Sequence, residues 1–404
     1  MNYLYFKFRL NPTKDQEKIL VDHCDVARFV YNQLLANNIS YYETDKKFHF
    51  GMSIVYESAK LRKEHNFLKL VNSQIIQQSA MNLGTAFKNI FSKKNKKSTG
   101  FPKFKSRRNN RQSFCVPQHF MVVNDKIKLP KIGWVEMINH RKISGKIKSV
   151  TIVKEIDQWY ASILCEQEEK VNLEINLNSV VGIDLGIKSF AVTSDGEVFN
   201  LPCTKKNTKK LKKLQRIHAK KKKDSKNRDK ARIKVAKEYR RITRIKTNYI
   251  NNIVATITKS YDVVSIENLN ISGMKKNKKL SGAIQQVPWG QFKNKLKQKA
   301  KSYYEVSRWF PSSKTCSGCG WVKKDLTLAD RTFNCDSCGL EIDRDVNAAI
   351  NLKTAATAGL ACGESSIGVN GSDPETRYGS MKQEGYIVRT PSSVGNQNIK
   401  SLNA

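Results

Sequence analysis

The sequence predicts an α/β protein of several domains, and three observations support this. At 404 residues the chain exceeds one ordinary hydrophobic core. Helical apolar periodicity in the first hundred residues gives way, between 112 and 175, to short alternating segments that are typical of strands. Further along, two apolar runs each end in a carboxylate, at Asp184 and at Glu267. Strands that deliver acids in this way predict a second sheet with a chemical function.

The charge of the chain predicts its partner. Its formal net charge is +38, from 73 Lys and Arg against 35 Asp and Glu. A surface with this large an excess of positive charge favours a polyanionic binding partner. Nucleic acid is favoured over a membrane, because the sequence shows no amphipathic anchor. The sequence has no run of 18 apolar residues, and its opening "MNYLYFKFRL" is too polar for a signal peptide. We therefore expect a protein without membrane partners that remains in the cytoplasm.

The first domain is expected to be a β-barrel into which a helical bundle is inserted. Residues 1–10 alternate as a strand does, and Thr13 and Gln16 stand in capping-box register at a helix start. A second helix is predicted over "NSQIIQQSAMNLGTAFKNIF". Its polar side carries amides that could read base edges or simply face solvent: Gln74, Gln77, Gln78 and Asn82. Strands follow in "HFMVVND", "KIKLPKIGWVEM", "KIKSVTIVKE" and "QWYASILCEQ".

The middle of the chain is strongly basic. Residues 204–247 predict long helices with thin apolar seams, and a run this one-sided favours phosphate contacts over a merely solvated face. Residues 271–312 predict a loop and helix leading to a further strand. Trp289, Phe292 and Trp309 in this segment are expected to be core residues, with base stacking as the alternative.

Four of the nine cysteines have the spacing of a metal site. They form "CSGCG" and "CDSCG", two C-x2-C pairs separated by fifteen residues: Cys316, Cys319, Cys335 and Cys338. This spacing fits a structural zinc site of four thiolates. Disulfides are the alternative, which an odd cysteine total in an intracellular chain disfavours. A closed site of this kind stabilises a fold, so the chemistry must lie elsewhere.

The acids at the strand ends suit phosphodiester hydrolysis. Two magnesium ions roughly 4 Å apart can activate water and hold the leaving oxygen, and magnesium prefers a few convergent carboxylates. The run "GIDLG" around Asp184 also opens actin-like ATPases, but it favours a ribonuclease-H-like sheet. Glu267 ends "VVSIE", and a third acid is needed from "DRDVNAAINL".

Asp345 is the better candidate of the two aspartates in that segment. Both could face a metal in principle, but Asp345 lies three and four residues before Ala348 and Ala349, which are expected to face the sheet. Asp343 precedes the helix, where it is expected to cap the first turn.

Together these motifs resemble the TnpB family, the OrfB proteins of insertion sequences and relatives of type V CRISPR effectors. "GIDLG", "IENLN", the two cysteine pairs and "DRDVNAAINL" occur in the family's order, and the resemblance covers roughly residues 1–354. It implies a monomeric ribonucleoprotein that acts as an RNA-guided DNA endonuclease in a prokaryotic, nucleoid-associated setting. A guide RNA from the element's end would pair with double-stranded target DNA beside a short motif. The alternative is a nuclease-inactive, RNA-guided DNA-binding repressor.

The resemblance also implies a division of the chain. A wedge-like β-barrel would comprise 1–10 and 100–176, and a helical recognition domain 11–99. A RuvC-like nuclease domain over 177–311 and 342–356 would carry two Mg²⁺ ions on the catalytic acids Asp184, Glu267 and Asp345. The zinc ribbon over 312–341 is inserted in it, and no second nuclease motif is visible, so one site would cut both strands. Residues 357–404 are rich in Gly and Ser and are expected to be a disordered tail.

Overall fold

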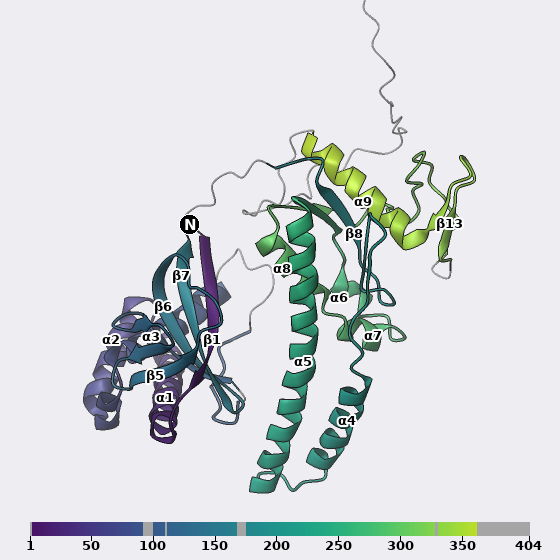
Figure 1. Cartoon of the computed structure of the whole chain (residues 1–404). Coiled ribbons are helices and arrows are strands. Elements are labelled where there is room, and N and C mark those ends of the chain that lie inside the picture. The colour runs from purple at the N-terminus through teal and green to yellow at the C-terminus, as the bar shows by residue number, and fades with distance from the viewer. Residues whose placement is uncertain (1, 92–99, 110, 168–174, 328–329, 362–404) are drawn as a thin grey trace, which may run out of the picture. The chain divides into compact units, whose positions relative to one another are not determined.

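The computed structural model describes residues 2–91, 100–109, 111–167, 175–327 and 330–361. The chain forms two compact units (Figure 1). The first comprises residues 1–172 and 211–238, and the second comprises 173–210 and 239–404. No helix among the described residues is long and apolar enough to span a bilayer.

The first unit contains a seven-stranded antiparallel sheet in the order β2-β6-β7-β1-β5-β4-β3. Its strands are β1 (Asn2–Asn11), β2 (Arg111–Val116), β3 (Met121–Val123), β4 (Lys126–Leu129), β5 (Gly133–Ile138), β6 (Lys146–Glu155) and β7 (Gln158–Gln167). Strand β1 pairs along nearly its whole length with β7, although about 150 residues separate them in the chain. The strands predicted before residue 11 and between 112 and 167 are therefore confirmed, and their alternating apolar side chains form one core.

Helices fill the sequence between β1 and β2. They are α1 (Lys14–Asp45), α2 (Met52–Glu64), the short 3-10 helix η1 (Asn66–Leu70) and α3 (Ser73–Phe91). The predicted capping box is present: the N–H of Gln16 donates to Thr13 Oγ1, and the Thr13 N–H donates to Gln16 Oε1. Helix α2 was not predicted, because its apolar residues are few; Ile54 and Leu61 nevertheless enter a core shared with α1 and α3.

The second unit is built on a five-stranded mixed sheet in the order β10-β9-β8-β11-β12. Its strands are β8 (Val180–Asp184), β9 (Ala191–Thr193), β10 (Val198–Phe199), β11 (Val263–Glu267) and β12 (Ser302–Val306). The pairs β8–β9 and β9–β10 are antiparallel, whereas β8–β11 and β11–β12 are parallel. The predicted strands that end in Asp184 and Glu267 are thus neighbours in one sheet.

The basic segment is helical, as predicted, in α4 (Lys205–Ala219) and α5 (Lys226–Ser260). The C-terminal part of α5 contributes Ile250, Ile253, Val254 and Ile257 to the core beneath the five-stranded sheet. Helices α6 (Ile271–Met274), α7 (Ser281–Gln286) and α8 (Trp289–Lys299) precede β12. Trp289 and Phe292 are buried as expected, but Trp309 is 85% exposed, so its assignment to the core was wrong. It lies in the turn after β12, outside any packed element.

The chain then forms the cysteine-bearing insert and ends, within the described residues, in a long helix. The insert contains the hairpin β13 (Thr332–Asn334) and β14 (Glu341–Asp343), which leads directly into α9 (Arg344–Ala361). Helix α9 lies on the five-stranded sheet (Figure 1). It extends five residues past the predicted start of the tail, because Leu360 still packs against buried Val180, Val263 and Ala356. The rest of the predicted tail, 362–404, lies outside the described residues.

Candidate active site and metal centre

Strand alternation places Asp184 and Glu267 on the same face of the sheet. Val181 and Ile183 of β8 pack in the core with α5, so Gly182 and Asp184 point to the opposite face. On β11 the same alternation turns Ser265 and Glu267 toward that opposite face. The parallel register pairs Ser265 with Gly182. Two residues further along these strands, Glu267 and Asp184 therefore lie at adjacent strand ends.

Helix α9 is fixed against this face by two contacts with the sheet. Ser265 Oγ donates a hydrogen bond to the carbonyl oxygen of Leu352 over 2.7 Å, and Ser265 is fully buried. At Gly182 the helix backbone approaches so closely that an added Cβ would lie 1.9 Å from the carbonyl oxygen of Ala349. Glycine is therefore required there by close packing. Gly182 lies two residues before Asp184, and Ser265 lies two residues before Glu267. The two contacts therefore fix the distance between α9 and the strand ends that carry these acids.

The start of α9 gives Asp343 and Asp345 different roles. Asp343 Oδ1 accepts hydrogen bonds from the N–H groups of Asp345 and Val346, at 2.9 and 3.1 Å, and so caps the helix as predicted. The carboxylate of Asp345 is instead paired with the Arg344 guanidinium, with Nη2 3.0 Å from Oδ1. Arg344 and Asp345 side chains are both largely buried.

The carboxylates of Asp345 and Glu267 both lie near enough to Asp184 to act on its pKa. Burial raises the pKa of Asp184, the nearby carboxylates of Asp345 and Glu267 raise it as well, and Arg344 opposes them; together these effects bring it to about 7. Burial also raises the pKa of Glu267, while the Lys293 ammonium acts in the opposite direction. Lys293 is held by an ion pair to Glu305, with Nζ 2.6 Å from the carboxylate. Such mutual repulsion is relieved when a cation binds between the carboxylates.

The donor set fits magnesium. Three carboxylates offer the hard oxygen ligands that Mg²⁺ prefers, and no thiol or imidazole is among them. Among the described residues, the four cysteines are the group of side chains placed to hold a metal ion, and the three acids are not such a group.

The four cysteines of the insert lie close together. The Sγ atoms of Cys316, Cys319, Cys335 and Cys338 all lie within 4.8 Å of one another, which confirms the expected cluster. Burial raises the pKa of Cys335, but hydrogen bonds from the N–H groups of Cys338 and Ser337 and with the Cys316 and Cys319 thiols outweigh it and lower the pKa to about 6. Burial raises the pKa of the neighbouring Cys316 thiol to about 12, so in the absence of metal the charge of the cluster resides on Cys335. A thiolate is the form that binds zinc, so this cluster could hold a Zn²⁺ ion. Gly320 and Gly339 close the two knuckles with φ near +79° and +76°.

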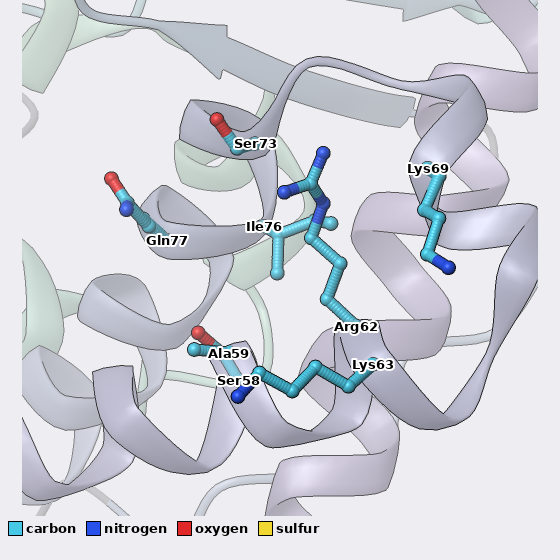
Figure 2. A pocket seen from close by; sticks show the side chains of 8 residues that line it. All are labelled: Ser58, Ala59, Arg62, Lys63, Lys69, Ser73, Ile76 and Gln77. Carbon is cyan, nitrogen blue, oxygen red and sulfur yellow. The ribbon is translucent and has the colours of Figure 1, made fainter.

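A separate pocket lies in the helical part of the first unit (Figure 2). Its volume is about 310 Å³, and it is lined by Ser58, Ala59, Arg62, Lys63, Lys69, Ser73, Ile76 and Gln77. In the view of Figure 2, Arg62 lies between Ile76 and Lys69. The Nε of Arg62 is buried and has no hydrogen-bond partner among the described residues. Three cationic side chains and the Gln77 amide are therefore among the groups that line this pocket.

Sequence reasoning missed several residues around the acids. Arg344 and Lys293 carry the charges nearest the site, and Asn347 and Asn351 are buried on α9. The asparagines were visible as polar residues inside an otherwise small and apolar helix, "DVNAAINL", and a buried polar residue at helical spacing is the signal that could have found them.

Comparison with known proteins agrees with these motifs. Residues 162–278 match the OrfB family described as "Probable transposase", residues 289–352 match the "Cas12f1-like, TNB domain", and residues 1–47 match a "Helix-turn-helix domain". In the structure this last region consists of β1 and the single helix α1. A cryo-EM structure of a Cas12f1-sgRNA-target DNA complex superposes with a TM-score of 0.47 at 15% identity, covering 87% of this chain and 98% of that one.

Two curated relatives match over nearly their whole length. A Streptomyces pristinaespiralis protein named "Putative RNA-guided DNA endonuclease" is 33% identical over 94% of this chain and 95% of its own. The Escherichia coli (strain K12) protein "Putative RNA-guided DNA endonuclease InsQ" is 32% identical, over 89% of this chain and 94% of its own. With this identity over this length, the chain belongs to the TnpB/OrfB family of insertion-sequence RNA-guided DNA endonucleases.

Proposed function

We propose that this protein is an RNA-guided DNA endonuclease with one active site, at Asp184, Glu267 and Asp345. The proposal is supported by the placement of Asp184 and Glu267 at the ends of adjacent strands beneath α9, which carries Asp345, and by the raised pKa of Asp184, to which the other two acids contribute. Family membership and the names of the curated relatives support the same activity. The strand order β10-β9-β8-β11-β12, antiparallel and then parallel, supports a ribonuclease-H-like, RuvC-type nuclease domain.

In this mechanism the protein orients the scissile phosphate and holds the metal ligands. Asp184 and Glu267 would hold the ions from the strand ends, and Asp345 from α9. Two Mg²⁺ ions held there would supply an activated water and stabilisation of the leaving oxygen. At pH below about 7 the carboxyl of Asp184 retains its proton, so its readiness to bind a cation increases as pH rises. The same site would cut each strand in turn.

The remaining parts receive roles by chemistry. We assign 1–10 with 100–176 to the wedge, 11–99 to the recognition domain, 177–311 with 342–356 to the nuclease domain, and 312–341 to the zinc insert. The basic helices α4 and α5 would contact nucleic-acid phosphates. The pocket with Arg62, Lys69 and Gln77 supports a role for the helical part in contacting DNA beside the target, where the amide could read a base edge.

The test is cleavage by the purified ribonucleoprotein. Its co-purifying RNA is sequenced, and a plasmid library with the matching target and random flanks is incubated with and without Mg²⁺. Linear product that needs Mg²⁺, the guide-matched target and intact Asp184 is expected. Guide-directed binding without any cleavage in the wild type would instead support the nuclease-inactive repressor.

A further inference from the structure

Two buried asparagines of α9 join the helix to the first cysteine knuckle. Asn347 Nδ2 donates to the carbonyl oxygen of Thr315 over 2.7 Å, and its Oδ1 accepts from the N–H of Ser317 at 2.9 Å. One turn further, Asn351 Nδ2 donates to the carbonyl oxygens of Ser312 and Thr315, at 2.8 and 2.6 Å. Cys316 lies between two of these attachment points.

These bonds are made where water is absent. Asn347 is fully buried, and Asn351 is 5% exposed. Removing one partner of a buried hydrogen bond leaves the other unsatisfied, which is unfavourable where water cannot replace it. Asn347 uses its amide as donor and acceptor at once, so it fixes both the distance and the rotation between α9 and the knuckle. Neither Asp nor Ala could replace both bonds.

The same turn of α9 carries Asp345. Just before it, the N–H of Arg344 donates to the carbonyl oxygen of Arg331 in the insert, at 2.8 Å. The Arg344 guanidinium pairs with Asp345. Asp345 is therefore bracketed by two attachments to the insert, at Arg344 and at Asn347, whereas the middle of the helix is attached to the sheet through Leu352.

The apolar core of the insert is small. Its buried core consists of Cys316, Phe333 and Cys335, with four partly buried hydrophobic residues around them. A core this small does not fold stably without a metal or a disulfide. Zinc bound to the four thiolates would hold residues 312–317 in place, and through Asn347 the position of the first turn of α9.

We propose that Asn347 is a positioning residue that transmits the geometry of the zinc knuckle to Asp345, so that occupancy of the zinc site sets the third ligand of the magnesium site. The inference rests on the proposed nuclease function for its kinetic readout, and it has a structural readout that does not. Asn351 supports the same attachment from one turn further away.

The kinetic experiment uses the complete ribonucleoprotein with Asn347→Ala, Asn351→Ala and the control Thr354→Ala. Thr354 is exposed on the same helix and bonds only to the carbonyl oxygen of Ile350. For Asn347→Ala we expect about one zinc per chain, unchanged guide-directed DNA binding, and a half-maximal Mg²⁺ concentration for cleavage raised about 10-fold, as for other residues that orient metal ligands. Asn351→Ala should shift it less, and Thr354→Ala should leave it unchanged.

Three outcomes would overturn the inference: an unchanged Mg²⁺ requirement in Asn347→Ala, loss of zinc from both asparagine variants, or loss of DNA binding in both. The last two would mean that the asparagines only build the zinc site or the fold. A wild type that binds its target but cleaves nothing would contradict the proposed function and leave this inference to the structural readout.

That readout is hydrogen exchange in the Mg²⁺-free ribonucleoprotein, comparing wild type with Cys335→Ser. We expect the amides of Asp345 and Val346, which are capped by Asp343, to exchange faster when zinc is lost, while those around Leu352 keep their protection. Equal exchange at the Asp345 amide in both proteins would show that the zinc knuckle does not position the start of α9. This conclusion would hold whether or not the protein cleaves DNA.

Discussion

The carboxylate of Asp343 accepts a hydrogen bond from the backbone N–H of Asp345 at 2.9 Å. Two aspartates separated by one residue therefore do different work. Asp343 accepts hydrogen bonds from free backbone N–H groups of the first helical turn, whereas the carboxylate of Asp345 pairs with Arg344 near Asp184. The division follows from helix geometry, because the residue before the helix caps it and the residue inside it projects from its face.

This division predicts different losses on substitution. Asp345→Asn should abolish cleavage while guide-directed binding remains, because an amide is a poor magnesium ligand. Asp343→Asn should retain substantial cleavage, since asparagine also caps helices well. The two variants are compared for target binding and Mg²⁺-dependent cutting. An inactive Asp343→Asn beside an active Asp345→Asn would reverse the assignment, and normal cutting by both would remove the three-acid site.

Gly182→Ala should displace α9 from the sheet. The new Cβ would meet backbone atoms, 1.9 Å from the Ala349 carbonyl oxygen and 2.5 Å from the Lys353 nitrogen, so the helix must shift. Overpacking of this kind costs about 1–3 kcal/mol of unfolding free energy. Gly282→Ala is the matched control, since its Cβ would meet open space in α7. Thermal unfolding measures both, and equal melting temperatures would show that the close approach is not rigid.

The contribution of Asp184 to stability without Mg²⁺ should fall as pH rises from about 4 to 7. The pKa of Asp184 is raised from 3.8 to about 7 in the folded protein, so over that window the unfolded chain has lost a proton that the folded chain retains. The loss is complete above pH 7, where the buried carboxylate is ionised. Asp184→Asn removes this contribution and should be more stable than the wild type at pH 8, with a smaller difference at pH 5.

This comparison is made by thermal unfolding in Mg²⁺-free buffer without chelator, so that zinc is retained. Adding Mg²⁺ at pH 8 should stabilise the wild type and leave Asp184→Asn nearly unchanged. A wild-type stability that stays level, or increases, between pH 5 and 8 relative to the variant would contradict the raised pKa.

The features that the sequence predicted are those set by neighbours in the chain. The Thr13 cap needs only Gln16, the Asp343 cap needs only the next residues, and a strand end is marked by where its apolar run stops. The attachment of Asn347 to Thr315 joins residues 32 apart, and the sequence shows no sign of it. Helix α2 went unpredicted because tertiary packing at Ile54 and Leu61 stabilises a segment with weak periodicity.

Affinity for nucleic acid should fall steeply with salt. With a net charge of +38, the protein should release counterions from each phosphate it neutralises, so that six or more contacts cost about 10³-fold in affinity between 50 and 200 mM salt. Replacing Lys220, Lys221, Lys222 and Lys223, all exposed after α4, with Gln should flatten the slope of log affinity against log salt. Binding measured in a salt series decides, and a flat wild-type curve would contradict the phosphate contacts.

Trp309 and Trp289 form a final matched pair, because one is 85% exposed and the other 1%. Trp289→Ala should cost about 3–5 kcal/mol of unfolding free energy through the cavity it leaves, whereas Trp309→Ala should stay within about 0.5 kcal/mol of wild type. If Trp309 stacks on a base, its loss should also weaken binding of single-stranded DNA by about 1–3 kcal/mol, and Trp309→Phe should restore most of that affinity. Denaturant unfolding and DNA binding are measured on both variants. A large stability loss in Trp309→Ala would restore the core assignment, and unchanged stability with unchanged binding would leave this side chain no role in stacking.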